Sequence, residues 1–327
     1  MKTADSCRRT VSGSHRAQCC RLCGVLVCWL STALAADDGP ARSVQDWPQK
    51  VVVTVGDIRT RIDGPKLWTL SGIDFQDQMV ATEDSAYGTV LTIRGVGHLG
   101  TAHFLDVPGQ PGKVEKEEVT HLRLTVDDQP SGPFQPSMNL AGRSFLLERK
   151  SKIRALDLQT TISIRDGVLI ETARFQTTGP LDLRIAYPWM YAWTPQATAY
   201  VFGNEQGIQQ RGQFLKEGKP TSMVVKDATW MAVFNPATGK GGVCCYLQHP
   251  AEDGRFLLVD APSAYRKIYP YTLEDKVLPT NFQGTYQAAL GFFTATAADW
   301  EARAKQRSAE VRSAAALQAK AIGASAN

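Results

Sequence analysis

Between residues 51 and 295 the sequence contains no amphipathic segment of helix length. Short runs of β-branched and aliphatic residues recur instead, separated by Gly, Asp and Pro, which is the pattern of β-strands joined by turns. The clearest runs are 51–55, 89–93, 121–126, 153–158, 161–164, 168–175, 181–185, 199–202, 230–234, 243–247, 256–259 and 286–293. Doubly wound folds and TIM barrels need a helix after each strand, so the pattern excludes both. We therefore predict an all-β fold, a large antiparallel two-sheet sandwich.

Two Asp-Gly pairs mark tight turns within this region. Asp166-Gly167 separates two alternating runs, and Asp253-Gly254 repeats the arrangement. A type I′ turn needs a positive φ at both central residues, which Asp and Gly adopt readily. Each pair therefore predicts a β-hairpin.

The two flanks of this β-sandwich domain (51–295) differ from it in composition. Residues 36–50 are polar, contain two prolines and predict an exposed segment that leads into the sandwich. Residues 296–327 are rich in Ala, Glu, Lys, Arg and Gln, the residues that favour a helix. One apolar stripe at helical spacing consists of Trp300, Ala304, Val311, Ala315, Ala319 and Ile322. Such a stripe predicts a C-terminal helix that docks on the sandwich and frays into a tail.

Residues 1–35 have the pattern of a secretory signal peptide. A basic region ends at Arg21, and residues 22–34 form an apolar stretch, shorter than the about 20 residues that span a bilayer as a helix. Ala33-Leu34-Ala35 supplies a small-x-small cleavage site. We expect a secreted or periplasmic protein that is cut after Ala35 and has no transmembrane segment. The alternative is a short N-terminal membrane anchor.

The charge distribution argues against a nucleic-acid partner. The formal net charge is +4, and residues 1–35 carry all of it, so the rest of the chain is neutral. Binding to nucleic acid depends on a basic excess that the mature chain lacks. We therefore expect no nucleic acid among the partners.

Five of the seven cysteines lie in the leader, which leaves only Cys244 and Cys245 in the mature chain. Adjacent residues of a strand point to opposite faces, so a disulfide between them would need a strained turn. We expect two free cysteines, at least one of them in the core.

The segment Gly95 to Gly100 matches GxGxxG, but it does not predict a dinucleotide site. Pro108, Gly109, Pro111 and Gly112 follow within a dozen residues and leave no room for the helix that such a site needs. We expect a tight loop between strands. The sequence has no GxSxG, P-loop, HExxH or EF-hand pattern, and we expect no cofactor and no metal.

Three of the four histidines of the mature chain fall within 24 residues, at His98, His103 and His121. Imidazole titrates near neutrality and serves as a general base or a metal ligand, but this spacing fits no standard metal motif. Glu117 shares strand parity with His121, so both side chains are expected to face the same way. We take these four residues as catalytic candidates. The alternative is a set of surface histidines beside a charged hairpin.

Four aromatic residues follow the alternating run 181–185 with a period of two: Tyr187, Trp189, Tyr191 and Trp193. In an extended chain their rings would line one face, where they could stack on sugars, although such rings also fill sandwich cores. We take them as candidate substrate-binding residues, with core filling as the alternative.

Tyr265 and Arg266 open a further group, Tyr265-Arg266-Lys267-Ile268-Tyr269-Pro270-Tyr271. A basic side chain beside Tyr could neutralise a uronate carboxylate while a phenol acts as acid or base. Tyr265 and Arg266 therefore join the substrate-binding candidates. An ordinary exposed strand is the alternative.

The run from Ile164 to Phe175 with its Asp-Gly turn, followed by 181–185 and Tyr187-Pro188-Trp189, resembles the galactose-mutarotase-like supersandwich proteins. The resemblance implies a large two-sheet sandwich that holds a carbohydrate in a concave face. Mutarotases use a His and a Glu as acid and base, but no family motif matches either residue here, so no catalytic role is carried over.

These features together predict a secreted, carbohydrate-directed protein. We favour an enzyme (a lyase, epimerase or hydrolase) that acts on a sugar or uronate polymer by His/Tyr acid–base chemistry. The alternative is a non-catalytic glycan- or protein-binding sandwich of the cell envelope, and a weaker one is a structural envelope protein. The expected partner is an oligo- or polysaccharide.

Overall fold

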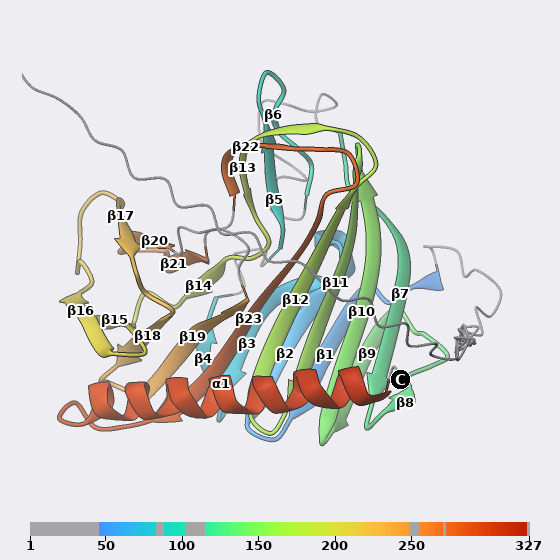
Figure 1. Cartoon of the computed structure of the whole chain (residues 1–327). Coiled ribbons are helices and arrows are strands. Elements are labelled where there is room, and N and C mark those ends of the chain that lie inside the picture. Colours follow the sequence, from blue (N-terminus) through green and yellow to red (C-terminus); the bar gives the residue numbers. More distant parts are fainter. Residues whose placement is uncertain (1–45, 83–87, 102–114, 249–254, 271–272, 326–327) are drawn as a thin grey trace, which may run out of the picture. The chain divides into compact units, whose positions relative to one another are not determined.

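A computed structural model describes residues 46–82, 88–101, 115–248, 255–270 and 273–325 (Figure 1). The leader, His103 and the Asp253-Gly254 pair lie outside these residues. Signal-peptide cleavage, a role for His103 and the second Asp-Gly hairpin therefore stay predictions.

Strands make up most of the described residues. They are β1 (Lys50–Val55), β2 (Ile58–Asp63), β3 (Thr69–Phe75), β4 (Gln78–Ala81), β5 (Val90–Ile93), β6 (Gly97–His98), β7 (Glu118–Val126), β8 (Gln129–Pro130), β9 (Ser137–Gly142), β10 (Ser144–Ile153), β11 (Leu156–Arg165), β12 (Val168–Thr177), β13 (Leu181–Tyr187), β14 (Tyr191–Trp193), β15 (Ala199–Asn204), β16 (Gly207–Gln213), β17 (Thr221–Lys226), β18 (Trp230–Asn235), β19 (Lys240–Gln248), β20 (Arg255–Ala261), β21 (Tyr265–Pro270), β22 (Leu273–Leu278) and β23 (Gln283–Thr294). A single 3-10 turn, Gly64–Lys66, interrupts the strands of the described residues, and the helix α1 (Trp300–Ser325) follows them.

The strands form three sheets. The order in the nine-stranded sheet is β17-β20-β21-β14-β4-β3-β2-β1-β9, and in the ten-stranded sheet it is β16-β15-β18-β19-β23-β12-β11-β10-β7-β8. A four-stranded sheet has the order β22-β13-β5-β6. Among the named strand pairs of the described residues, only β1 and β9 run parallel. The prediction of an all-β, antiparallel sandwich is confirmed.

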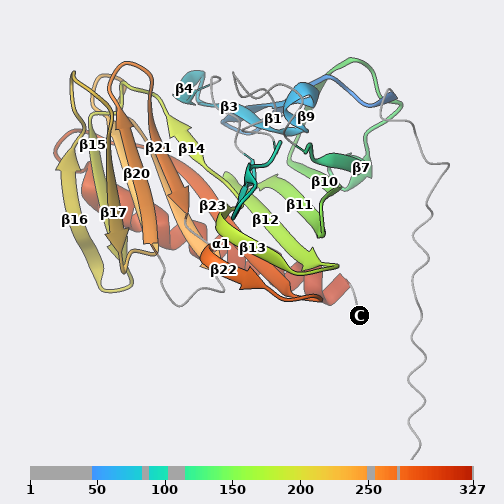
Figure 2. The same cartoon turned by 90° about the horizontal axis from the view of Figure 1, so that it is seen from above.

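The main core lies between the nine-stranded and the ten-stranded sheet. Figure 2 shows β1, β3 and β9 on one side and β10, β11 and β12 on the other. Phe292 of β23 stacks on Phe75 of β3 with ring centroids 5.6 Å apart, and it meets Trp193 of β14 edge-on at 6.4 Å. Burial of alternate apolar residues from both sheets is therefore what holds the layers together.

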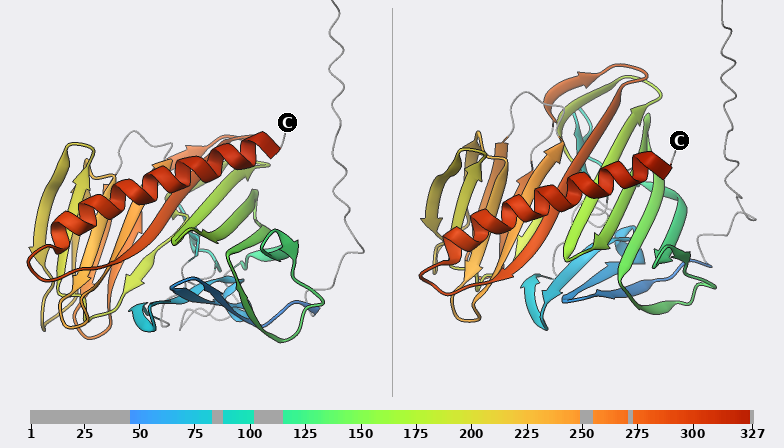
Figure 3. Two further views of the ribbon diagram at one scale, coloured as in Figure 1. Left: turned by 90° about the horizontal axis from the view of Figure 1, so that it is seen from below. Right: turned by 60° about the horizontal axis from the view of Figure 1, so that its bottom comes forward.

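The helix α1 covers part of the other face of the ten-stranded sheet (Figure 3). Its buried stripe packs on Val168 and Ile170 of β12, and Trp300 stacks on Phe234 of β18 at 5.3 Å. The stripe residues buried there are Trp300, Ala304, Val311 and Ala315. The predicted docked helix is confirmed, while the side chains of Ala319 and Ile322 are outside the described part. Within that part, no helix is both long and apolar enough to cross a membrane.

Two local predictions have opposite outcomes. Asp166 and Gly167 adopt φ of 54° and 71°, and Arg165 pairs with Val168, so the Asp-Gly hairpin between β11 and β12 is confirmed. The expected strand over 153–158 is wrong, because the chain turns at Arg154 (φ 51°) and Ile153 pairs with Leu156. An apolar run gives no sign of a turn that needs neither Gly nor Pro.

Cys244 and Cys245 are both buried and free on β19. Cys244 belongs to the core between the sheets, whereas Cys245 belongs to the cluster under α1. Burial raises the pKa of the Cys245 thiol to about 12. The prediction of two free cysteines with at least one in the core is confirmed, and neither thiol is a ready nucleophile.

Candidate functional site

The predicted aromatic wall is not formed, because the chain changes sheets inside it. Tyr187 ends β13 in the four-stranded sheet, and Tyr191 begins β14 in the nine-stranded sheet. Trp189, Tyr191 and Trp193 are 2%, 0% and 0% exposed. Their period of two therefore serves core packing, and the expectation of four rings on one open face is wrong. Tyr187 alone is half-buried.

Glu117 and His121 face opposite ways, contrary to the prediction from strand parity. Ser151 of β10 pairs with Val119, but Lys150 pairs with His121, so Thr120 is an extra residue in a β-bulge. One extra residue reverses the faces of all that follow. Glu117 consequently points into the core, and His121 lies on the other face, where it lines an open hollow of about 470 Å³.

The side chain of Glu117 belongs to a buried polar network. It accepts a hydrogen bond from the Ser151 hydroxyl at 2.6 Å and lies 3.4 Å from the guanidinium of Arg149. Arg149 also donates to Thr160 and to the carbonyl of Leu67. Both contacts of Glu117 involve its Oε1, whereas Oε2 is buried without a hydrogen-bond partner among the described residues. Burial in the core leaves Glu117 without access to a substrate.

Arg266 is also a structural residue. Only 3% exposed, it forms an ion pair with Asp260 and donates to the carbonyl of Leu215 at 2.8 Å. Its guanidinium lies 5.0 Å from the ring centroid of Phe214. These contacts hold β21 to the segments around it.

His98 lies in the Gly-rich segment, which forms a hairpin rather than a dinucleotide loop. Gly95 and Gly97 adopt φ of 74° and 102°, and β6 folds back on β5 so that His98 pairs with Thr92. The hydroxyl of Thr92 lies 2.8 Å from Nδ1 of His98 and fixes the ring. Partial burial and the charge of Arg184 lower the imidazole pKa. His98 is therefore an exposed, mainly neutral imidazole at neutral pH.

A buried lysine with tyrosines around it lies on β21. Its residues alternate, so Tyr265, Lys267 and Tyr269 share one face of β21 and the core residue Ile268 lies on the other. The partly buried ring of Tyr265 also packs against the edge of the core. The ammonium of Lys267 lies 4.1 Å from the ring centroid of Tyr265, and the ring of Tyr187 meets that of Tyr269 at 4.9 Å. We call Tyr187, Tyr265, Lys267 and Tyr269 the lysine–tyrosine cluster.

Lys267 is 6% exposed, and no carboxylate within the described residues forms an ion pair with it. Burial lowers the pKa of its ammonium from 10.5 to about 8. Burial also raises the pKa of Tyr187 to about 12 and that of Tyr269 further, so both phenols keep their protons near neutrality. A buried cation without a counter-ion is rare in a purely structural setting, and perturbed groups of this kind gather at functional sites.

The face that carries His98 continues towards this cluster. His98 pairs with Thr92, and two residues along β5 Val90 pairs with Tyr187, so His98 and Tyr187 lie on one face of the four-stranded sheet. Two strand spacings and two residues of rise put their Cα atoms about 12 Å apart. Of the predicted residues, the structure thus puts His98 and Tyr187 on one face, and it puts Tyr187 against Tyr269 of the strand that also carries Tyr265.

Lys267 and Tyr269 complete the cluster, and the sequence prediction did not select either. The signal was available: a period of two along Tyr265-Arg266-Lys267-Ile268-Tyr269 puts Lys267 with the two tyrosines and Arg266 with Ile268. In the described part of the chain, no three His, Cys, Asp or Glu side chains gather as ligands of a metal ion would. The chemistry available at the cluster is that of an amine, phenols and an imidazole.

No protein-family model matches the sequence, and neither does any curated protein. Solved structures resemble it at low identity. The Slr1438 protein of Synechocystis sp. PCC 6803 has a TM-score of 0.50 and 8% identity over 76% of this chain and 97% of that chain. A galactose mutarotase related enzyme from Lactobacillus acidophilus has a TM-score of 0.41 and 8% identity over 76% and 98%.

The galactosidase domain of the α-galactosidase–sucrose kinase AgaSK has a TM-score of 0.46 and 10% identity over 75% of this chain. This chain spans 40% of that one. At such identities the likeness concerns the fold alone. The structures that this chain resembles do include galactose-mutarotase-like proteins, as the pattern of residues 164–189 predicted.

Proposed function

We propose that this protein binds a sugar that carries a carboxylate, with Lys267 as the counter-ion. The observation behind this proposal is the buried ammonium of Lys267, which lacks an ion-pair partner in the described part of the chain. Leaving a charge in this state costs folding free energy, and a bound carboxylate would supply the missing partner. A uronate offers a carboxylate and several hydroxyls in one compact ring.

The phenols around Lys267 suit the rest of such a ligand. Their raised pKa values keep Tyr187 and Tyr269 protonated, so each hydroxyl can donate to and accept from a sugar hydroxyl. Tyrosine also offers an apolar ring face beside its polar tip, and sugar rings have both kinds of surface. Lys267 selects the acid group, and the tyrosines fit the ring that bears it.

Acid–base chemistry at the carbon next to the carboxylate is the second part of the proposal, with His98 as the base because it shares a face of the four-stranded sheet with Tyr187. The neutral imidazole of His98 takes the proton from that carbon, and the electron pair of the broken C–H bond moves towards the carboxylate. Lys267 stabilises the negative charge that develops there. In a lyase the pair then forms a C=C bond and expels the glycosidic oxygen, which a tyrosine protonates. In an epimerase a proton returns to the opposite face of the same carbon.

Titration calorimetry with galacturonate and galactose tests the binding step. We expect galacturonate to bind about 10- to 100-fold more tightly, since a charge-assisted hydrogen bond contributes about 1.5–3 kcal/mol. Lys267→Met should remove this preference, and Lys219→Met, at an exposed position, should keep it. Equal affinity for both sugars in the unaltered protein would refute the proposal.

Turnover is tested separately on uronate polymers and monosaccharides. A lyase produces an unsaturated product that absorbs ultraviolet light, and an epimerase incorporates deuterium from heavy water at the carbon beside the carboxylate. His98→Ala should abolish either signal and leave uronate binding in place. Binding without any turnover in the unaltered protein would identify the non-catalytic, glycan-binding alternative.

We also propose that the protein acts outside the cytoplasm, on the basis of the leader sequence. The mature protein would then begin at Ala36, because the small-x-small site ends at Ala35. Intact-mass spectrometry of protein recovered from the medium or the periplasm tests this. A recovered chain that still contains residues 1–35 would contradict the proposal.

A further inference from the structure

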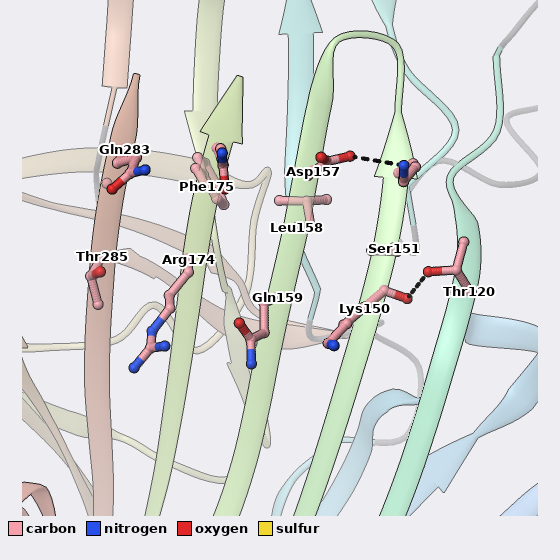
Figure 4. Close-up of a pocket in the computed structure, with 13 residues that line it drawn as sticks. Thr120, Lys150, Ser151, Asp157, Leu158, Gln159, Arg174, Phe175, Gln283 and Thr285 are labelled. Atoms are coloured by element: carbon pink, nitrogen blue, oxygen red, sulfur yellow. Dashed lines mark hydrogen bonds and ion pairs between the residues drawn. The ribbon is translucent and has the colours of Figure 1, made fainter. Parts of the chain in front are cut away.

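One row of polar side chains crosses the outer face of the ten-stranded sheet, beyond the part that α1 covers. In the strand register Thr285 pairs with Arg174, Arg174 with Gln159, and Gln159 with Lys150. Directly paired residues point to the same face, so these four side chains stand side by side across β23, β12, β11 and β10. Figure 4 shows them projecting from the sheet into a common hollow.

The two neighbouring rows contain their own ion pairs. On one side Lys152 of β10 lies 3.7 Å from Asp157 of β11. On the other side Arg123 of β7 lies 3.4 Å from Glu148 of β10. Each of these two cations thus has a carboxylate partner within the protein, and Glu118 of β7 adds a further exposed carboxylate beside Lys152.

The middle row differs, because its two cations have no such partners. Among the described residues no carboxylate lies within ion-pair distance of Arg174 or Lys150, although both are exposed on a surface that carries acidic groups. Two strand spacings separate them, so their Cα atoms lie about 10 Å apart. Gln159 stands between them and can both donate and accept a hydrogen bond.

The hollow over this row has a volume of about 400 Å³. The side chains that line it from the outer face are polar: Thr120, Lys150, Lys152, Asp157, Gln159, Arg174, Gln176, Gln283 and Thr285. Leu158 and Phe175 also line the hollow, but both are buried. Protein partners are usually anchored by buried aromatic or aliphatic side chains, and single-stranded nucleic acid by aromatic rings that stack on bases. The exposed side chains of this lining offer neither, since Phe175 and Leu158 are buried. Amides and hydroxyls between two cations match a ligand with many hydroxyls and spaced negative charges.

We propose that a linear acidic polysaccharide binds across the strands here, with successive anionic groups on Arg174 and Lys150 and the intervening hydroxyls on Gln159. This surface is separate from the lysine–tyrosine cluster, which belongs to the nine-stranded and four-stranded sheets. The inference therefore does not depend on the proposed function. It gives the protein a means of staying on a polymer whether or not it acts on one.

Affinity electrophoresis in gels that contain polygalacturonate, dextran sulfate or unmodified dextran tests the proposal. All measurements use the Lys267→Met background, so that the cluster adds no charge recognition. We expect retardation by one or both acidic polymers and none by dextran, and the stronger of the two shows whether carboxylates or sulfates are preferred. Added salt should weaken the retardation, since exposed charges are screened.

The double variant Lys150→Ala/Arg174→Ala should bind about tenfold more weakly, because both charges meet the ligand. Its matched control is Arg59→Ala/Lys226→Ala, which removes the same net charge from exposed positions on other strands. The control should stay within about twofold of the unaltered affinity, the range expected for charges far from the contact. All four positions are exposed, so urea unfolding should show that both variants fold.

Several outcomes would overturn the inference. Equal losses in the double variant and its control would show that net charge alone drives binding. Retardation by dextran equal to that by the acidic polymers would remove the role of the cations. Competition by poly-glutamate as strong as that by polygalacturonate would show that the surface does not recognise a saccharide.

Discussion

The hydroxyl of Tyr191 lies 2.6 Å from a carboxyl oxygen of Glu171 in the middle of the sandwich. Tyr191 belongs to β14 in the nine-stranded sheet and Glu171 to β12 in the ten-stranded sheet, so this hydrogen bond joins the two layers. Burial raises the pKa of Glu171 to about 8, against the opposing effects of Tyr191 and of the charge on Arg149. At neutral pH the folded protein thus keeps Glu171 mostly protonated.

This raised pKa predicts a specific pH dependence of stability. The unfolded chain releases the Glu171 proton near pH 4.5, whereas the folded protein holds it up to about pH 8. The free energy of unfolding should therefore fall between about pH 5 and pH 8, by a few kcal/mol in order of magnitude, and level off above. Glu171→Gln cannot titrate and should remove this slope. Urea unfolding at a series of pH values measures it, with the exposed Glu205→Gln as the control. Parallel curves for Glu171→Gln and the unaltered protein would contradict the prediction.

The value of the inter-sheet hydrogen bond can be measured with two tyrosines. Tyr191→Phe leaves the Glu171 carboxyl without its donor and should lower the free energy of unfolding by about 1–3 kcal/mol. Tyr286→Phe is the matched control, because its buried hydroxyl has no hydrogen-bond partner among the described residues. We expect a change of less than about 0.5 kcal/mol there, or a gain. Urea unfolding at one pH compares the two. A larger loss for Tyr286→Phe would reverse our assignment.

Arg149 is predicted to be the most sensitive charged residue of the core. It donates to Thr160 at 2.9 Å and lies 3.4 Å from Glu117, with both charges buried. Arg149→Met should cost about 3–5 kcal/mol, because Glu117 is then a buried charge without its partner. Adding Glu117→Gln should recover part of that loss, and a double-mutant cycle in urea measures the coupling. The exposed Arg143→Met should have little effect. Additive losses would show that the pair is not coupled.

The proposed counter-ion Lys267 should lower the free energy of unfolding of the ligand-free protein. Its folded pKa of about 8 lies below the unfolded value of 10.5, so stability rises with pH between these values as the folded protein releases the proton first. Below pH 8 the charged ammonium, which has no ion-pair partner within the described part of the chain, lowers the stability of the fold. Lys267→Met should therefore raise the free energy of unfolding by about 1–3 kcal/mol at pH 7, and by less at pH 10. Urea unfolding at both values checks this. A loss of stability at pH 7 would mean that Lys267 has a structural partner.

Some of these features could be predicted from the sequence because they depend on local chemistry. Asp166-Gly167 adopts the left-handed backbone that its turn requires, and the stripe from Trp300 to Ala315 docks α1. Strand alternation also predicts that Lys267, and not Arg266, lies on the same face as Tyr265 and Tyr269, since residues two apart share a face of a strand. This prediction holds only if the strand is continuous from Tyr265 to Tyr269, and β21 is continuous over these residues.

The prediction that residues two apart share a face was wrong where the chain is not one continuous strand. The bulge at Thr120 separates Glu117 from His121, and a bulge has no fixed sequence signature. The passage from β13 to β14 puts Tyr187 in one sheet and Trp193 in another, so a regular aromatic spacing produced a buried cluster. Nothing local distinguishes a ring that stacks on a sugar from one that fills a core.

By itself the sequence determined the class of fold, the main strands, one hairpin and the terminal helix, because hydrophobic periodicity and turn chemistry act over a few residues. Only the tertiary structure decided that Tyr187 meets Tyr269, that Lys267 has no counter-ion among the described residues and that Arg174 and Lys150 stand in one row. Burial and charge compensation depend on which strands become neighbours. The packing of the sheets settles that choice, and it joins residues far apart in the chain.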